Sequence, residues 1–214
     1  SDMEQARATA VAAIDAANGE LRDLSLDIHS NPELAYEEVY AHDVLTGFLE
    51  GRGFQIERGA YGMPTAFRAV AGSGEPTVAV LCEYDALPGI GHACGHNLIA
   101  AGSSLAAVAA KAAVDATGGR ISVFGTPGEE GGGGKIIMAE AGAFKDLDAA
   151  MMVHPGVKDI ACPRVLAART VRVEYFGKAA HASADPEQGI NALEAMLLAF
   201  NGINSLRQHI PESA

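Results

Sequence analysis

The 214-residue sequence is 49% hydrophobic and 20% charged, which is typical of a globular protein with one good core and material for a smaller second one. Its net charge of -12 disfavours nucleic acid or an anionic membrane as partner, because no basic patch would neutralise phosphates. Three cysteines are too few for a disulfide framework and no signal or spanning segment stands out, so we expect a cytoplasmic protein.

Helices and strands are predicted to alternate along most of the chain. Residues 4–30 are alanine-rich with helical apolar spacing, and Asn31-Pro32 ends this helix because the residue before proline avoids the α region. A second amphipathic helix is predicted over 36–51, where the adjacent Glu37 and Glu38 are expected on solvated surface. The further elements expected are strands at 54–57, 65–71, 77–82, 120–126 and 149–153, and helices at 97–117, 135–143 and 189–209.

The pattern changes after residue 154. Apolar and charged residues alternate over 171–175, which is typical of a half-exposed strand. We therefore place a domain boundary near Leu166. The predicted boundary divides the chain into a first domain over 1–166 and the start of a second domain over 167–214.

Potential metal ligands follow the predicted strand at 77–82. The strand ends in the acidic turn 83–85, and the segment His92-Ala93-Cys94-Gly95-His96-Asn97 follows soon after. Cysteine and histidine packed this closely indicate a transition metal. Open α/β sheets bind ligands at the carboxyl ends of their strands, which is where this segment is expected to lie.

Two further strands end in the same kind of residue. Glu129 and Glu130 follow the strand at 120–126, and His154 follows the strand at 149–153. The four glycines at 131–134 imply close backbone approach. A phosphate-binding loop is excluded, since its spacing requires glycine at 129 and serine or threonine at 136. The side chains expected to converge on one sheet edge are Cys94, His96, Glu129, Glu130 and His154.

The remaining cysteines and histidines have simpler interpretations. Free cysteine is among the most buried residue types, and a lone histidine is more often packing than chemistry. We therefore expect structural or surface roles for Cys82, Cys162, His29, His42 and His209.

Five segments together carry a family resemblance. They are EYDALP at 83–88, HACGHN at 92–97, the paired glutamates with their glycines at 129–134, MVHP at 152–155 and GKAAHAS at 177–183. This set resembles the dinuclear metal amidohydrolases of the aminoacylase and glutamate-carboxypeptidase superfamily, nearest to the branch of aminobenzoyl-glutamate hydrolase, auxin-conjugate hydrolase and dipeptidases. The resemblance runs in register from about residue 20 to the end.

The resemblance implies an α/β fold. The catalytic domain would be a three-layer α/β/α domain of the zinc-exopeptidase type, with an inserted α+β, ferredoxin-like lid and dimerisation domain, and both would be incomplete in this chain. Relatives continue to nearly twice this length and supply a final histidine ligand, which we expect beyond residue 214.

The resemblance also implies a role for each matching site residue. Cys94 would bridge two divalent metal ions, and Glu129 would be the general base acting on a metal-activated water. Asp85 would orient a ligating histidine, a role that metal sites commonly require. The implied metal ligands are Cys94, His96, Glu130 and His154.

Two residues of the second domain receive implied roles. His181 would bind the substrate and act in catalysis at the site of the other subunit of a homodimer formed through the lid. Asn191 would help to hold the substrate carboxylate. One departure is Asn97, where many relatives carry aspartate, and it could alter the hydrogen bonding around the metal.

The implied reaction is hydrolysis of the amide bond in N-acyl amino acids, aminobenzoyl-glutamate-like conjugates or dipeptides. The substrate would be a small molecule with a free carboxylate. Two cations about 3.5 to 4 Å apart can polarise an amide carbonyl and lower the pKa of a shared water. Cysteine and histidine favour zinc, and the carboxylates also suit manganese or cobalt.

Two alternatives remain open. The first is a catalytically incomplete metal- or ligand-binding fragment of the same fold. The second is thiol hydrolysis with Cys94 as nucleophile and His92 or His96 as base, which leaves Glu129, Glu130 and His154 without a role.

Overall fold

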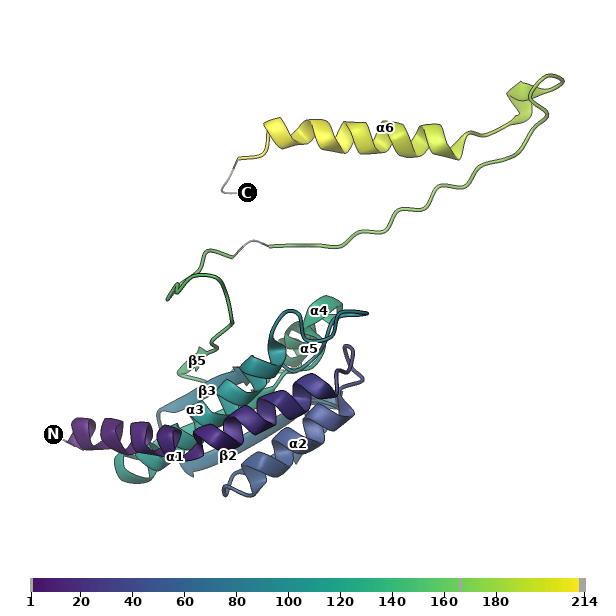
Figure 1. Ribbon diagram of the computed structural model, residues 1–214. Coiled ribbons are helices and arrows are strands. Elements are labelled where there is room, and N and C mark those ends of the chain that lie inside the picture. Colours follow the sequence, from purple (N-terminus) through teal and green to yellow (C-terminus); the bar gives the residue numbers. More distant parts are fainter. Residues whose placement is uncertain (1, 166, 212–214) are drawn as a thin grey trace. The chain divides into compact units, whose positions relative to one another are not determined.

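The computed structural model describes residues 2–165 and 167–211, so Leu166, where we place the domain boundary, lies outside the described residues. The chain divides into two compact units, Ser1–Asp159 and Ile160–Ala214 (Figure 1).

The N-terminal unit contains a mixed sheet with helices on it. The strands follow the order β1-β2-β4-β3-β5. They are β1 (Gln55–Arg58), β2 (Phe67–Ser73), β3 (Thr77–Cys82), β4 (Gly119–Gly125) and β5 (Ala149–Met151). The helices are α1 (Asp2–Ser30), α2 (Val39–Glu50), α3 (His96–Thr117), α4 (Glu129–Gly132) and α5 (Gly134–Glu140), with a 3-10 turn at Ala60–Gly62.

The sheet has a hydrophobic cluster on each face, as the strand pattern requires. Helices α1, α2 and α3 cover one face (Figure 1), and alternate residues such as Val80 and Cys82 of β3 pack against them. Ala79 of β3 points to the other face and joins Phe124 of β4 and Met138 of α5. Helices on both faces make the unit a three-layer α/β/α fold.

Strand register decides where the site can form. Strand β3 pairs in parallel with β4, with Cys82 opposite Gly125, and it pairs in parallel with β5, with Val80 opposite Met151. The segments that leave the carboxyl ends of these three strands therefore emerge at one edge of the sheet.

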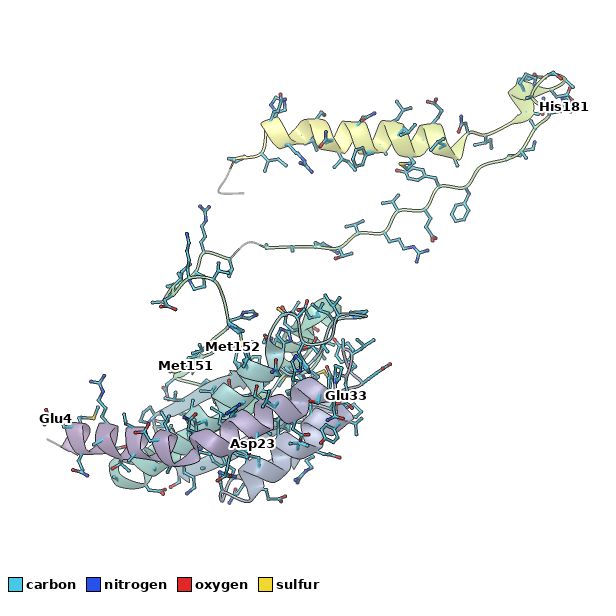
Figure 2. The ribbon with its side chains drawn as sticks, in the orientation of Figure 1. Glu4, Asp23, Glu33, Met151, Met152 and His181 are labelled. Carbon is cyan, nitrogen blue, oxygen red and sulfur yellow. The ribbon has the colours of Figure 1, made fainter. Side chains whose placement is uncertain are left out.

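Helix α2 begins later than the predicted residue 36. Tyr36 has a φ of 67°, a left-handed conformation that does not fit inside an α-helix. The Glu33 carboxylate accepts hydrogen bonds from the backbone N–H groups of Tyr40 and Ala41 at 2.9 and 3.0 Å. Glu33 (labelled in Figure 2) thus caps the amino end of α2 with a negative charge.

Helix α3 is a core helix. By length and composition alone it could cross a membrane, but half of its apolar stretch is buried inside the unit. It packs against α1 and against β3 and β4. The amide group of Asn97 donates to the Ser25 carbonyl and hydroxyl oxygens at 3.2 and 3.0 Å, which ties α3 to α1. An aspartate at 97 could not donate these bonds.

The C-terminal unit contains α6 (Ala192–Ser205) and two 3-10 turns, Pro186–Gln188 and Leu206–Gln208. The strand predicted over 171–175 is not formed, and that prediction is wrong for this chain. Figure 1 shows an extended segment there, but it has no ladder partner among the described residues, and a strand requires one. The β-bridge found in the described part of this unit is a single antiparallel one, between Lys178 and Ile190.

Candidate metal centre

His96 stands at the centre of the site, at the first position of α3. Its imidazole is fully buried, and Nδ1 lies 3.0 Å from the Asp85 carboxylate, which can only accept a hydrogen bond. Nδ1 therefore carries the proton in the neutral ring, and Nε2 presents its lone pair. The other Asp85 oxygen accepts a hydrogen bond from the Glu130 backbone N–H at 2.9 Å. One carboxylate thus fixes two segments of the site.

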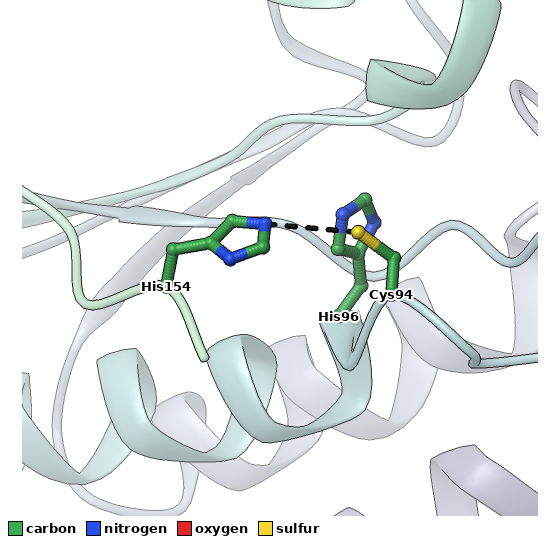
Figure 3. A group of neighbouring side chains, drawn as sticks. All are labelled: Cys94, His96 and His154. Atoms are coloured by element: carbon green, nitrogen blue, oxygen red, sulfur yellow. Dashed lines mark hydrogen bonds between the residues drawn. The ribbon is translucent and has the colours of Figure 1, made fainter. Parts of the chain in front are cut away.

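Cys94 and His154 approach each other from different segments. Cys94 Sγ lies 3.7 Å from His154 Nε2, with His96 beside them (Figure 3). The carbonyl oxygen of Pro155 lies 2.8 Å from His154 Nδ1 and accepts its hydrogen, so Nε2 faces Cys94 unprotonated in the neutral ring. Gly95 permits this approach, because its φ is +81° and a Cβ there would lie 2.7 Å from the Pro155 side chain.

Glu129 and Glu130 reach the same place from the end of β4. Their nearest carboxylate oxygens lie 3.9 and 3.8 Å from His96 Nε2. In two overlapping groups, Cys94, His96 and His154 in one and His96, Glu129 and Glu130 in the other, the potential ligand atoms lie within 4.8 Å of one another. The structure therefore brings together the six residues of the N-terminal unit to which the sequence assigns site roles, namely Asp85, Cys94, His96, Glu129, Glu130 and His154.

These donors suit a divalent cation. His96 Nε2 and an oxygen of the neighbouring Glu83 are both buried, and neither has a hydrogen-bond partner among the described residues. Buried polar atoms normally have partners, so two that face one another indicate a ligand. Thiol, imidazole and carboxylate donors together are those that zinc accepts.

The protonation of Cys94 argues against the thiol alternative. Burial and the neighbouring Glu130 and Glu129 carboxylates raise the pKa of the Cys94 thiol to about 12. A nucleophilic cysteine needs a lowered pKa, whereas the carboxylates here raise the pKa of Cys94. An adjacent cation would lower that pKa by offsetting the charge of the carboxylates, and the thiolate would then face the cation. Burial opposes charging of His96, but the Asp85 hydrogen bond and the nearby carboxylates raise its pKa. His92, the other base considered, has its pKa lowered by burial and by His29.

The loop at 128–134 is held by two residues to which the sequence assigned no role at the site. Glu38, expected on solvated surface, is instead completely buried, and that prediction is wrong. Its carboxylate accepts hydrogen bonds from the Gly128 N–H at 2.8 Å and from Thr65 Oγ1 at 3.0 Å. The Tyr36 hydroxyl donates to the Gly132 carbonyl at 2.5 Å. Helix spacing alone could not reveal Glu38, because its partners are far along the chain.

His181 and Asn191 belong to the C-terminal unit. Figure 2 shows His181 in the turn that precedes α6, where its Nδ1 accepts from the Ser183 and Ala184 N–H groups at 3.3 and 3.2 Å. The Asn191 side chain caps α6 by accepting from the Glu194 N–H at 3.1 Å. Both residues are exposed, so their surfaces are available within that unit.

The chain is similar to known peptidases and hydrolases over most of its length. A family model described as peptidase family M20/M25/M40 matches residues 65–213. The Xaa-Arg dipeptidase of Mus musculus is 44% identical over 225 residues, an alignment that covers 98% of this chain and 52% of the relative. A p-aminobenzoyl-glutamate hydrolase component of Escherichia coli (strain K12) is 37% identical, covering 94% of this chain and 46% of the relative. The chain therefore spans about half the length of the curated relatives it matches.

Solved structures share the fold. A putative aminohydrolase from methicillin-resistant Staphylococcus aureus matches 95% of this chain and 58% of its own, with a TM-score of 0.70 at 22% identity. A dinuclear metal binding peptidase of the M20 family from Bacillus subtilis matches 64% of this chain and 42% of its own, with a TM-score of 0.55 at 25% identity.

Proposed function

The chain belongs to peptidase family M20/M25/M40, and we propose that its protein is a metal-dependent amidohydrolase acting on dipeptides, N-acyl amino acids or aminobenzoyl-glutamate-like conjugates. The observation that carries this proposal is the convergence of thiol, imidazole and carboxylate donors around His96 within 4.8 Å. The family's chemistry and the geometry of this edge of the sheet support the same reaction.

Two divalent metal ions are proposed as cofactors, with zinc favoured over manganese or cobalt by the sulfur and nitrogen donors. Cys94, His96, Glu130 and His154 would hold them. When bound, such ions polarise a substrate carbonyl and lower the pKa of a water at the site toward neutrality.

Glu129 is proposed as the general base. Its side chain is 44% exposed, so it reaches water and substrate, whereas that of Glu130 is 21% exposed. A carboxylate beside the attacking water can take its proton and pass that proton to the leaving amine. Asp85 would keep the His96 ring in one orientation and one tautomer throughout.

The substrate class follows from the relatives. A dipeptide with C-terminal arginine is the first compound to test, because the 44% identical relative is named an Xaa-Arg dipeptidase. Aminobenzoyl-glutamate is the second, on the name of the Escherichia coli relative. Both keep a free carboxylate, and we assign Asn191 and His181 to its recognition, with His181 acting across a homodimer formed by the domain that begins near 167. A cytoplasmic location is proposed with this function.

The test uses the full-length protein stripped of metal with a chelator and then reloaded with zinc, manganese or cobalt. Amine release is measured from an Xaa-Arg dipeptide, from aminobenzoyl-glutamate, and from the same dipeptide with its carboxylate amidated. We expect turnover only after metal is restored and a large loss with the amidated control. Turnover that persists in the stripped protein would exclude the proposal, and metal binding without turnover of any substrate would favour the incomplete-site alternative.

A further inference from the structure

Glu83 is a buried carboxylate for which the proposed reaction has no role. It directly follows β3, and only 2% of its surface is exposed. One oxygen, Oε1, forms an ion pair with the Lys135 ammonium group at the start of α5. The other oxygen, Oε2, has no hydrogen-bond partner among the described residues. A buried carboxylate oxygen without a partner is costly, which implies that something else satisfies it.

The unpartnered oxygen faces the unpartnered nitrogen of His96. Oε2 of Glu83 lies 3.3 Å from His96 Nε2. That separation is short enough for a hydrogen bond, yet the two atoms do not align into one, and both remain without a hydrogen-bond partner among the described residues. A well-aligned hydrogen bond is therefore not what holds the two atoms so close.

A shared cation explains the distance. Zinc binds imidazole nitrogen and carboxylate oxygen at about 2.0 to 2.2 Å, so two such ligands at a tetrahedral angle lie roughly 3.4 Å apart, and about 3 Å apart at a right angle. The separation of 3.3 Å between Glu83 Oε2 and His96 Nε2 falls between these values. Glu130 and Glu129 lie farther from the same nitrogen, at 3.8 and 3.9 Å.

Lys135 is placed to fix this carboxylate. Its ammonium group holds Oε1 of Glu83, which leaves Oε2 as the one oxygen free to coordinate. The ion pair also offsets part of the negative charge that Glu83, Glu129, Glu130 and Asp85 bring to one place. A lysine beside a potential cation site is otherwise unfavourable, so its pairing with Glu83 is consistent with an orienting role.

We propose that Glu83 is a further ligand of the metal ion held by His96, bound through Oε2 while Lys135 holds Oε1. This inference rests on the metal site of the proposed function and adds a donor to it. The cation would then be held from the end of β3 itself, in addition to the loops that carry Cys94 and Glu130.

Cobalt(II) titration of the metal-free full-length protein tests the assignment. Visible absorption of cobalt reports the number and type of ligands, and a sulfur-to-metal charge-transfer band reports Cys94. Glu83→Gln keeps the size of the side chain and an oxygen that can still accept from Lys135. Glu129→Gln is the matched control, because it removes the same charge at a similar distance from His96 without removing a proposed ligand.

We expect Glu83→Gln to bind cobalt at least about 100-fold more weakly, because loss of even an outer partner of a ligand costs about 10–100-fold. The d–d absorption bands should also change. Glu129→Gln should keep the bands and bind within about 10-fold of wild type. Circular dichroism checks folding, and if Glu83→Gln does not fold, Glu83→Asp, with its carboxylate one methylene shorter, should change the same bands.

The outcomes separate the two proposals. If the wild-type protein binds cobalt with the sulfur band and folded Glu83→Gln, or Glu83→Asp in its place, gives an unchanged spectrum, Glu83 is not a ligand and only this inference fails. If the wild-type protein binds no cobalt at this site, the proposed function fails with it.

Discussion

Replacing Glu38 with alanine should destabilise the N-terminal unit strongly. The completely buried carboxylate accepts hydrogen bonds from Thr65 Oγ1 and the Gly128 N–H. Alanine would leave both donors without a partner, and each unsatisfied buried group costs about 1–3 kcal/mol. We therefore expect a loss of roughly 2–6 kcal/mol in the free energy of unfolding, less whatever water recovers by entering the space.

Glu37 provides the matched control, because it is the adjacent glutamate and is exposed. Glu37→Ala should change the free energy of unfolding by no more than about 0.5 kcal/mol, as surface substitutions do. Urea unfolding followed by circular dichroism measures both variants against the wild type. Equal stability of the two variants would refute the argument that Glu38 anchors the loop.

The pH dependence gives a second measurement on the same residue. Burial raises the pKa of Glu38, although hydrogen bonds from backbone N–H groups and Thr65 partly offset the effect. A raised pKa means that the folded state favours the protonated form. Its stabilising contribution is full below the unfolded value of about 4.3 and is lost as the pH rises through the folded value. Relative to Glu38→Gln, the wild type should therefore lose stability as the pH rises through this window. A difference in unfolding free energy between the two proteins that does not change with pH would contradict the raised pKa of Glu38.

Three further predictions concern the site. Glu129→Gln should retain metal, measured by elemental analysis, while turnover falls about 100-fold or more; unchanged turnover would remove Glu129 as the base. In Gly132→Ala, the new Cβ would lie 2.4 Å from the Tyr36 ring and hydroxyl, so the variant should unfold at a lower urea concentration. Adding Tyr36→Ala should relieve part of this loss of stability. If the stability losses of the two single variants simply add in the double variant, the contact does not exist. Mixing full-length Glu129→Gln with His181→Ala should restore part of the activity if His181 serves the other subunit, and no recovery after proven subunit exchange would exclude that role.

The central strands could be predicted because each is a largely apolar run of residues in the sequence. The apolar run at 77–82 became β3, and the run predicted at 120–126 became β4 one residue earlier, since two-sided burial demands continuous apolar residues. The strand predicted at 171–175 failed for the opposite reason. Alternating apolar and charged residues are compatible with a strand, but a strand forms only when a neighbouring strand pairs with it, and a local sequence pattern does not supply that neighbour.

Some residues of the site could likewise be predicted from the sequence, and Glu83 could not. Cys94, His96, Glu129 and Glu130 stand at predictable positions, because ligands at the ends of adjacent parallel strands must converge. No sequence pattern assigns a role to Glu83, although it stands in the same acidic turn as Asp85. Its burial and its pairing with Lys135 depend on α5, which lies about 50 residues further along the chain, at Gly134–Glu140.

The outer edge of β5 has a practical consequence for handling this chain. All three residues of Ala149–Met151 are exposed, and β3 is the one strand that pairs with β5 among the described residues. Met151 and Met152 lie along this edge (Figure 2). Unpaired backbone groups beside apolar side chains form a template on which another copy can add in register. Preparations of this chain should therefore lose monomer as concentration rises, and Met151→Lys, which places a charge on that edge, should slow the loss.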